Sequence, residues 1–423
     1  MQRESETISI ISITSTSIIL VLGNSMLIPV LPEIRHDLQL TQVQASLILS
    51  IFSIAGAVTI PFIGYLSDRF SRKHIILASL LLYGFGGLVS GIASMLPASY
   101  SFEGIIFGRI LQGIGSAGTA PIAMAIIADL FSGNKQLKVL SLMETTNSLG
   151  KVVSPLIGAC IALIMWHYVF FVFPLACGIL FFLFFFYVGK EESPSEKVIF
   201  KHYVRHLGGV LKENRYYLMT SYSAGALCLY LLFGLLYYSS DVLENKFETH
   251  GFLNGVILSF PLLFLTIASF LTGNVLGKFH NYIYRIVIAN FFLLSFFLLG
   301  ILLNKNLWWT MLIISLISTS IGIILPCMNA IITNSVKKKA RGFVTSLYGS
   351  VRFAGIALGP IVFGYFMDFS IPSILVISSV LCLLQAILCF FFLEGKKKSI
   401  SLHAITNWFS IFNLPSQRKK QRG

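Results

Sequence analysis

Four charged side chains stand inside long apolar stretches of the sequence: Arg109, Glu144, Lys151 and Arg352. A charge inside a segment that crosses a bilayer is costly unless it is paired or hydrated, so such residues usually serve a function. A carboxylate at that depth can bind and release a proton, and a cationic side chain can hold an anion. These residues predict transport chemistry, with Glu144 carrying, or helping to carry, a proton.

Helical spacing places Glu144 and Lys151 on one face, because seven residues at about 100° each leave them only about 20° apart. Asn147, Ser154 and Gly158 fall within about 80° of Glu144 on the same side. This face is polar and small, which predicts that it lines a water-filled cavity. The alternative is a buried Glu–Lys pair that only holds helices together.

A repeat relates two segments of the chain, one around Pro155 and one around Pro360. The two prolines are 205 residues apart and both are flanked by glycines. This pattern indicates two related halves, and secondary transporters bind their substrates between such halves. We assign the following residues to helix packing: Pro29, Gly113, Gly150, Pro155, Gly158, Gly355, Gly359 and Pro360.

The repeat also places Arg352 at the position that Asn147 has in the first half, eight residues before the proline. Arg109, Lys151 and Arg352, relieved only by Glu144, predict a cavity that favours an anionic or zwitterionic substrate. Tyrosines near the seventh apolar run can stack on an aromatic ligand, although packing and a belt at the membrane interface are their commoner roles. The predicted substrate-binding residues are Asn24, Asn147, Lys151, Tyr230 and Arg352.

The elements that position these residues are membrane helices. Of 423 residues, 56% are hydrophobic and 11% are charged, and the mean hydropathy is +0.82. Soluble proteins carry about 25% charged residues, so the solvent of this chain must be lipid. A spanning helix needs about 20 apolar residues, and twelve runs qualify: 7–31, 42–66, 74–96, 102–130, 137–165, 167–188, 218–242, 251–276, 281–303, 307–334, 341–367 and 372–393.

We therefore expect an all-α integral membrane protein with twelve transmembrane helices in two pseudo-symmetric six-helix halves. The halves are residues 1–188 and 218–393. A cytoplasmic linker, 189–217, joins them, and a basic cytoplasmic tail, 394–423, follows. Basic residues in the linker and aromatic and basic residues in the tail are candidates for contact with the inner leaflet, and a disordered tail is an equal alternative.

The basic residues predict the orientation in the membrane. With both termini in the cytoplasm, the inner segments and the adjoining inner ends of the spans hold 25 of the 31 lysines and arginines, the outer loops hold three and the interiors of the spans hold three. The net charge of +14 is therefore mostly topological, and no nucleic-acid partner is expected. We expect a multi-pass protein of a bacterial cell membrane, with the lipid bilayer around it.

One inner loop combines a glycine, an acid and several bases. Residues 64–73 read Gly-Tyr-Leu-Ser-Asp-Arg-Phe-Ser-Arg-Lys, and an acid ends the fourth run. Such a cluster can pair with acids on neighbouring helix ends, hold one conformation and release it in another. The predicted gating residues are Gly64, Asp68, Arg69, Arg72 and Asp129. An ordinary positive-inside loop is the alternative.

This loop resembles the signature between helices 2 and 3 of the major facilitator superfamily, in its twelve-helix drug/proton antiporter branch, with Ser71 where glycine is usual. Residues 22–32 are similar to the branch's proline-rich motif of helix 1. Residues 109–117 are similar to its helix 4 motif, which implies that Arg109 takes part in proton coupling.

Residues 150–158 resemble the antiporter motif of helix 5, with Ser154 in place of the glycine before the proline and Ala159 in place of the final glycine. Residues 149–155 are also similar to helix 5 of bacillibactin-type siderophore exporters. That similarity implies an anionic and aromatic substrate, such as a catecholate siderophore.

Together these features predict a proton-coupled secondary transporter that exports a small organic molecule by alternating access. A broad multidrug/proton antiporter is the first alternative, and an uptake symporter or a lipid-linked flippase is the second. No hydrolase or nucleotide-binding motif occurs, so we do not expect an enzyme. The six cysteines lack paired spacing, and we expect no cofactor and no metal. The expected partners are the substrate and protons, with the protein as a monomer.

Overall fold

The computed structural model describes residues 2–67, 69–131, 133–189, 215–247, 252–275, 282–304, 306–334 and 338–394. Within these ranges the chain is built of helices joined by short turns. The predicted gating residue Asp68, most of the predicted linker and nearly all of the predicted tail lie outside the described residues.

The first half runs from α1 to α8. Its elements are α1 (Gln2–Ser25), η1 (Ile28–Val30), α2 (Leu31–Asp37), α3 (Gln42–Ser67), α4 (Arg72–Ser94), α5 (Ala98–Ser116), α6 (Ala120–Leu130), α7 (Gly133–Ala162) and α8 (Tyr168–Tyr187). The second half contains α10 (Arg215–Phe247), α11 (Phe252–Val275), α12 (Ile283–Gly300), η3 (Ile301–Leu303), α13 (Leu307–Asn334), α14 (Lys338–Phe369), α15 (Ile371–Cys389) and η4 (Phe390–Glu394).

Eleven segments of the described chain are long and apolar enough to cross a membrane. The remaining long helix, α7, has 30 residues and carries Glu144, Asn147 and Lys151, which lower its hydropathy. Counting α7, the structure has the twelve crossings that the sequence predicts. The one polar crossing is the helix on which the sequence places proton and substrate chemistry.

Two of the predicted runs are interrupted in the structure. α1 ends at Ser25, and the crossing continues through η1, which has Pro29 in its first turn. α5 ends at Ser116, and α6 continues with Pro121 in its first turn. A proline lacks the N–H donor of a helix interior and is tolerated in a first turn, so each of these prolines lies where a new helical segment begins.

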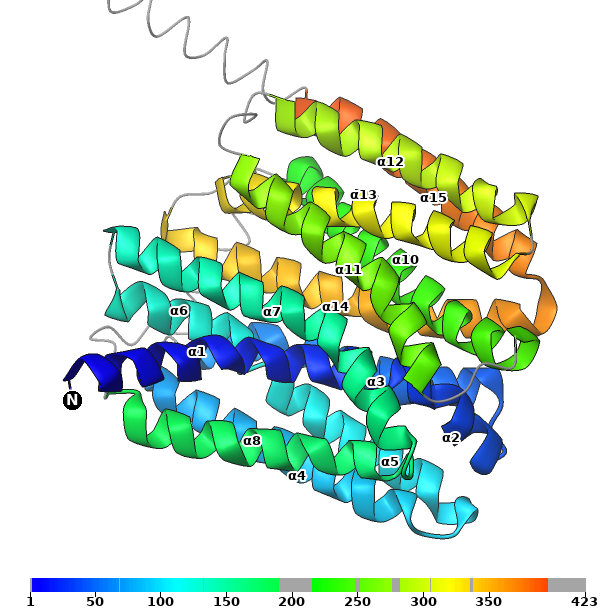
Figure 1. Ribbon diagram of the computed structural model, residues 1–423. Helices are drawn as coiled ribbons and strands as arrows, with labels where there is room; N and C mark the ends of the chain where they lie inside the picture. The colour runs from blue at the N-terminus through cyan, green and yellow to red at the C-terminus, as the bar shows by residue number, and fades with distance from the viewer. Residues whose placement is uncertain are drawn as a thin grey trace, which may run out of the picture.

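The helices run roughly parallel or antiparallel to one another (Figure 1). We call the end where α1 begins and α3 ends the near end, and the end where α2 ends and α3 begins the far end. The halves meet along two helix pairs, α3 with α14 and α7 with α11.

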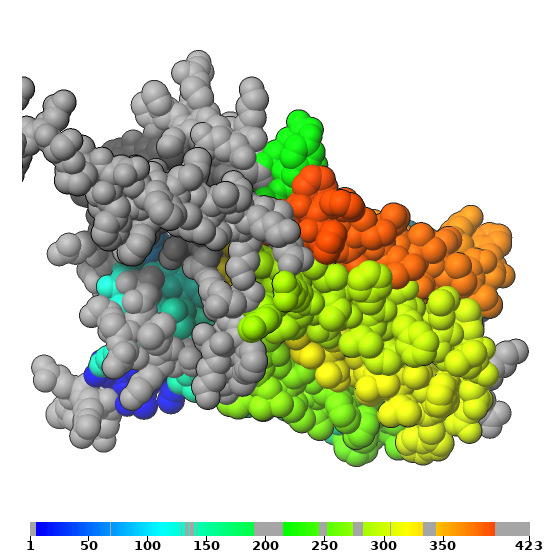
Figure 2. All heavy atoms as spheres, turned by 90° about the horizontal axis from the view of Figure 1, so that it is seen from above, coloured from blue at the N-terminus to red at the C-terminus, as the bar shows by residue number. Residues whose placement is uncertain are grey.

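The outer surface of the bundle is apolar. Figure 2 shows a face formed mainly by α12, α13 and α15. Large exposed side chains of these three helices include Phe296, Leu312 and Val380. A soluble protein would bury such a surface. Its extent is what a bilayer requires of the helices that face it.

Close helix contacts occur where glycine is present. A Cβ atom added at Gly113 or Gly355 would collide with a backbone carbonyl oxygen of a neighbouring helix, and one added at Gly158 would collide with Met26 O in the break between α1 and η1. A Cβ atom added at Gly359 would likewise collide with a carbonyl oxygen, because Tyr230 O would lie 2.5 Å from it. Gly150 differs, because its nearest neighbour, Val21, would lie 3.6 Å away. Small residues let membrane helices approach closely, and these contacts fix the rotation of α5, α7 and α14.

Candidate functional site

Three faces of α7 can be told apart by what they contact. Toward α11 lie Ser148, whose carbonyl accepts from Thr266 Oγ1 at 3.3 Å, and Val152, whose carbonyl accepts from Ser259 Oγ at 2.9 Å. Toward α1 lie the positions Met143, Gly150 and Gly158. Toward lipid lie the exposed side chains of Leu142, Leu149 and Val153.

Lys151 lies between the α1 and α11 faces and opposite the lipid face, by the 100° step of a helix. It has no route to lipid, yet it keeps partly accessible surface. At about 1.5 Å per residue it stands about 27 Å from Gly133 and about 16 Å from Ala162. By this geometry the side chain points toward the interior between the halves.

Arg352 occupies the corresponding place on α14. The α10 side of this helix carries Gly355 and Gly359, the α3 side carries Ser346 and Phe353, and the exposed Leu358 faces lipid on the opposite side. Arg352 falls between the α10 and α3 sides and is only partly accessible. It points inward from the second half as Lys151 does from the first.

The charges of Lys151, Arg352 and Glu144 are close enough to act on one another. Among the described residues, however, neither Lys151 nor Arg352 forms an ion pair with a carboxylate. Glu144 lies closer to the near end and its side chain is exposed. Two cations from opposite halves thus face the interior, and neither is ion-paired with a carboxylate of the described chain.

Three polar atoms around these cations lack hydrogen-bond partners. Asn147 Oδ1, Arg352 Nε and the hydroxyl of Tyr348 are buried without a partner among the described residues. Buried polar groups are normally satisfied, so Asn147 Oδ1, an acceptor, and Arg352 Nε, a donor, are candidates for contact with a bound molecule. We call the interior around Lys151 and Arg352 the chamber.

Arg109 is in a different situation. Its side chain is fully buried within the first half. Nε donates to Ile48 O at 2.9 Å, Nη2 to Gly23 O at 2.7 Å and Nη1 to Gln112 Oε1 at 2.9 Å. Gly23 lies in the last turn of α1, just before the break at Ser25, so Arg109 satisfies a carbonyl at a helix end. The structure does not place Arg109 in the chamber with Lys151 and Arg352.

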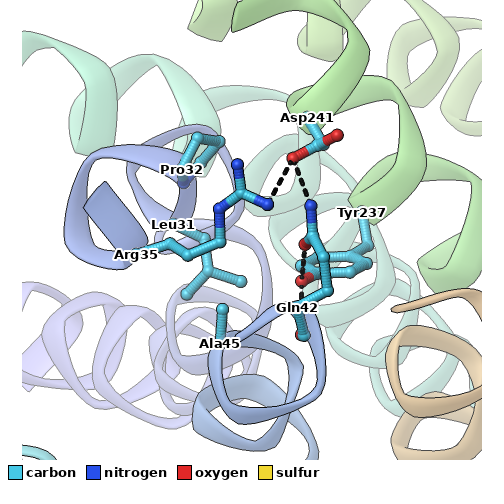
Figure 3. A pocket seen from close by; sticks show the side chains of 7 residues that line it. All are labelled: Leu31, Pro32, Arg35, Gln42, Ala45, Tyr237 and Asp241. Atoms are coloured by element: carbon cyan, nitrogen blue, oxygen red, sulfur yellow. Dashed lines mark hydrogen bonds and ion pairs between the residues drawn. The ribbon is translucent and has the colours of Figure 1, made fainter. Parts of the chain in front are cut away.

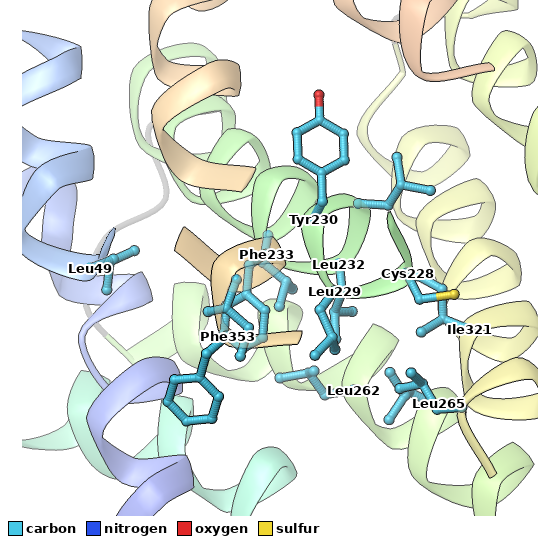
Figure 4. Packing of buried hydrophobic residues seen from close by; sticks show 14 of the residues in the cluster. Leu49, Cys228, Leu229, Tyr230, Leu232, Phe233, Leu262, Leu265, Ile321 and Phe353 are labelled. Atoms are coloured by element: carbon cyan, nitrogen blue, oxygen red, sulfur yellow. The ribbon is translucent and has the colours of Figure 1, made fainter. Parts of the chain in front are cut away.

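Two other predicted binding residues make hydrogen bonds within their own halves. Asn24 is buried in the first half, and its Oδ1 accepts a hydrogen bond from Ser53 Oγ at 3.0 Å. Tyr230 directs its hydroxyl to Ser378 Oγ of α15, 3.4 Å away. Figure 4 shows the Tyr230 ring pointing away from Phe353. Each of these two side chains makes its hydrogen bond inside its own half.

The predicted gating residues divide between contacts within one half and contacts across the halves. Arg72 pairs with Asp129, which joins α4 to α6 inside the first half. Arg69 lies over the ring of Phe70, with Cζ 5.9 Å from its centroid. Gly64 faces the second half, where Ser346 Oγ would be 3.2 Å from an added Cβ. Of these contacts, the one at Gly64 crosses the boundary that must move.

The sequence did not reveal how the far end is closed. Asp241 Oδ1 of α10 accepts from Gln42 Nε2 of α3 at 2.7 Å and pairs with Arg35 Nη1 of α2 at 3.3 Å (Figure 3). Tyr237 donates to the carbonyl oxygen of Gln42 at 2.8 Å, and Ser240 Oγ donates to Ile28 O at 2.7 Å. We call Arg35, Gln42, Tyr237 and Asp241 the far-end latch.

A second polar cluster at the far end lies within the first half. Trp166 Nε1 donates to Asp37 Oδ2 at 2.6 Å, and the ring of His167 stacks on Trp166 at a centroid distance of 3.7 Å. Burial lowers the pKa of His167, and the nearby carboxylate of Asp37 opposes that shift. The cluster ties the end of α2 to the connection between α7 and α8.

Comparison with known proteins identifies the fold. Residues 13–360 and 285–422 match the Major Facilitator Superfamily. The chain belongs to the major facilitator superfamily. Its members are membrane transporters and not enzymes, which confirms the predicted fold class and family.

Two curated relatives and one solved structure illustrate the similarity. The bacillibactin exporter of Bacillus subtilis is 37% identical over 391 residues, which covers 92% of this chain and 97% of that protein. Multidrug resistance protein 3 of Bacillus subtilis is 24% identical over 372 residues, 74% of this chain and 70% of that protein. The crystal structure of the human organic anion transporter MFSD10 (TETRAN) superposes with a TM-score of 0.69 at 19% identity, covering 91% of this chain and 99% of that chain. The predicted resemblance to bacillibactin-type exporters is confirmed.

Sequence reasoning also missed Tyr348. Its ring centroid is 5.4 Å from Cζ of Arg352 and 5.9 Å from the ring centroid of Tyr222. Its spacing could have identified it, because Tyr348 precedes Arg352 by four residues and therefore lies on the same face of the helix.

Proposed function

We propose that this transporter exports a small anionic organic molecule from a bacterial cytoplasm in exchange for protons. The observation that carries the proposal is the pair of interior cations, Lys151 and Arg352, contributed by opposite halves and unpaired with any carboxylate among the described residues. An uncompensated positive chamber favours an anion and repels a cation. A ligand bound between the halves also contacts both of them, which is the condition for linking its binding to their movement.

The substrate class follows from the charges and from the relatives. Arg352 lies beside the Tyr348 ring, and Arg352 Nε and Asn147 Oδ1 are a buried donor and a buried acceptor without partners among the described residues. An anionic, aromatic molecule with hydroxyl or amide groups, such as a catecholate siderophore, would satisfy them. The 37% identity to a bacillibactin exporter over most of both chains supports this class.

Proton coupling is assigned to Glu144. It is exposed on the interior side of α7 and acts electrostatically on Lys151.

The membrane orientation belongs to the proposal as well. The near end carries the basic connections of the chain, so it is assigned to the cytoplasm, and the far end, with its latch, to the outside. The latch contacts join the halves at the far end, which supports the proposal that substrate enters from the cytoplasmic side. Export then requires the latch to open while the near end closes.

Transport into vesicles tests the function. Purified protein is reconstituted into liposomes with a lumen at pH 6 in a medium at pH 7.5, and uptake of 2,3-dihydroxybenzoylglycine, a catechol amide with a carboxylate, is measured by mass spectrometry. Antiport predicts saturable accumulation in the acid lumen through inverted molecules. Passive entry of a weak acid would favour an alkaline lumen, so the direction separates the two routes.

A broad multidrug/proton antiporter is the second candidate, favoured by the similarity to multidrug resistance protein 3 of Bacillus subtilis. That candidate predicts that the cationic dye ethidium accumulates in the same vesicles. Accumulation of the acid probe in an alkaline lumen with the same protein, and none in empty liposomes, would indicate symport and contradict the proposal.

A further inference from the structure

Arg352 has no carboxylate partner among the described residues, and its Nε is buried without an acceptor. The contact described for its charged group is an aromatic one. Cζ lies 5.4 Å from the centroid of the Tyr348 ring, one helical turn earlier on α14. This distance is within the range of a cation–π interaction, about 6 Å.

Tyr348 is itself held in place by α10. Its ring stacks on Tyr222 with centroids 5.9 Å apart and planes inclined by 25°. Tyr222 cannot turn freely, because its hydroxyl donates to Val344 O at 2.9 Å. At Gly225 of α10 an added Cβ would collide with the Tyr348 ring, so only glycine leaves room for the ring there. The side chain of Tyr348 is 4% exposed.

An aromatic partner and a carboxylate partner would affect the charge of Arg352 differently. A carboxylate partner would hold the guanidinium but would also cancel its charge toward a ligand. The face of an aromatic ring attracts the cation through its quadrupole and adds no net charge. An arginine held by a ring is therefore fixed in direction and still fully cationic.

Arg109 shows the opposite arrangement in the first half. Its Cζ also lies over a ring, 4.5 Å from the centroid of Phe52, but all three of its nitrogens donate to protein oxygens. Its hydrogen-bonding capacity is largely used inside the protein. Arg352 keeps an unused donor at the boundary between the halves.

We propose that Tyr348, braced by Tyr222, is a positioning residue that holds the guanidinium of Arg352 toward the substrate anion without neutralising it. The inference rests on the proposed function, because it assumes that an anion binds at Lys151 and Arg352. It adds the specific role of an aromatic support on the second half. The ring is the acting group, and the Tyr348 hydroxyl contributes little.

The test compares KM and kcat for 2,3-dihydroxybenzoylglycine in the vesicle assay. Tyr348→Leu removes the ring and is expected to raise KM about tenfold, which lies between the effects of an exposed and a desolvated cation–π interaction, with kcat nearly unchanged. Tyr348→Phe keeps the ring and should restore KM to within about twofold of the wild type. Tyr216→Leu is the matched control, because Tyr216 also lies under an arginine, Arg215, with Cζ 4.8 Å from its ring, but is exposed at the near end. It should leave KM unchanged.

A double-mutant cycle separates positioning from packing. In an Arg352→Gln background there is no cation to hold, so Tyr348→Leu should raise KM no further. A tenfold effect that persists in that background would mean that Tyr348 acts by packing and would overturn the proposal. So would a Tyr348→Phe variant that is as impaired as Tyr348→Leu.

The failure of the proposed function gives a different result. If Lys151→Ala leaves KM for the acid probe unchanged, the anion site itself is wrong. If Lys151→Ala raises KM and Tyr348→Leu does not, the anion site stands and only the aromatic support is refuted. Tm of each purified variant is measured, and a Tyr348→Leu protein that fails to fold is replaced by Tyr348→Met, with the same expected rise in KM.

Discussion

Replacing Asp241 by asparagine should open the far end. The change keeps the shape and one oxygen acceptor for Gln42 but removes the negative charge that Arg35 contacts at 3.3 Å. The Arg35 and Asp241 side chains are 24% and 17% exposed, so the pair is partly shielded from water. Exposed ion pairs contribute about 0–1 kcal/mol and hydrogen bonds to charged groups about 1.5–3 kcal/mol.

A loss of about 1–2 kcal/mol is therefore expected, which shifts the ratio of open to closed far ends roughly 5- to 30-fold. The assay is a distance distribution between spin labels at Tyr100→Cys and Leu303→Cys, exposed positions at the far end of opposite halves, in a variant without native cysteines. Asp241→Asn should enlarge the long-distance population by that factor.

Glu103→Gln is the matched control for this experiment. Glu103 is an exposed acid in the first turns of α5 at the far end, and no contact with the second half is described for it. The control should leave the distribution as in the wild type. An unchanged distribution in Asp241→Asn, or an equal change in Glu103→Gln, would refute the assignment of the latch.

Three further predictions concern the chamber and its packing. Lys151→Ala should abolish export of the acid probe, and Lys151→Glu should in addition admit lipophilic cations; unchanged export of the acid by Lys151→Ala would contradict the anion site. Glu144→Gln should remove the response of transport to a pH gradient, and if full pH-driven transport persists, an acid at the far end must carry the proton. Gly355→Val forces a side chain into the backbone of α10 and should destabilise the protein by about 1–3 kcal/mol, seen as a lower Tm. Gly178→Val is the control and should not lower Tm, because an added Cβ at Gly178 meets nothing within 4 Å. An equal fall in Tm in Gly355→Val and Gly178→Val would contradict the packing argument.

The membrane crossings and the inward faces of single helices could be predicted from the sequence, because both depend on the periodicity of apolar and polar residues. Runs of about 20 apolar residues define the crossings, and the 3.6-residue period put Lys151 on an interior face. The repeat of glycines and prolines then located Arg352 on the other half. These inferences need only one helix at a time, or a relation between equivalent helices.

Contacts between residues that are distant in the chain could not be predicted from the sequence. Gln42 and Asp241 are 199 residues apart, and nothing in either segment indicates that they meet. The sequence indicates that Arg109 is a charge within an apolar segment. Its acceptors include backbone carbonyls of α1 and α3, and no residue type in the sequence marks a backbone acceptor. Tyr230 sits on a helix whose rotation is set by close contacts at glycines, and that rotation turns its hydroxyl toward α15.

The central claim is that the chamber between the halves selects a negative charge. It is tested most directly by calorimetric binding of 2,3-dihydroxybenzoylglycine and of its uncharged methyl ester to the purified transporter. The account predicts that the wild type binds the acid at least about tenfold more tightly than the ester, as one charge-assisted contact provides, and that Lys151→Ala combined with Arg352→Gln reduces this ratio to near one. Equal affinity of the wild type for acid and ester, or tighter binding of ethidium than of the acid, would contradict it.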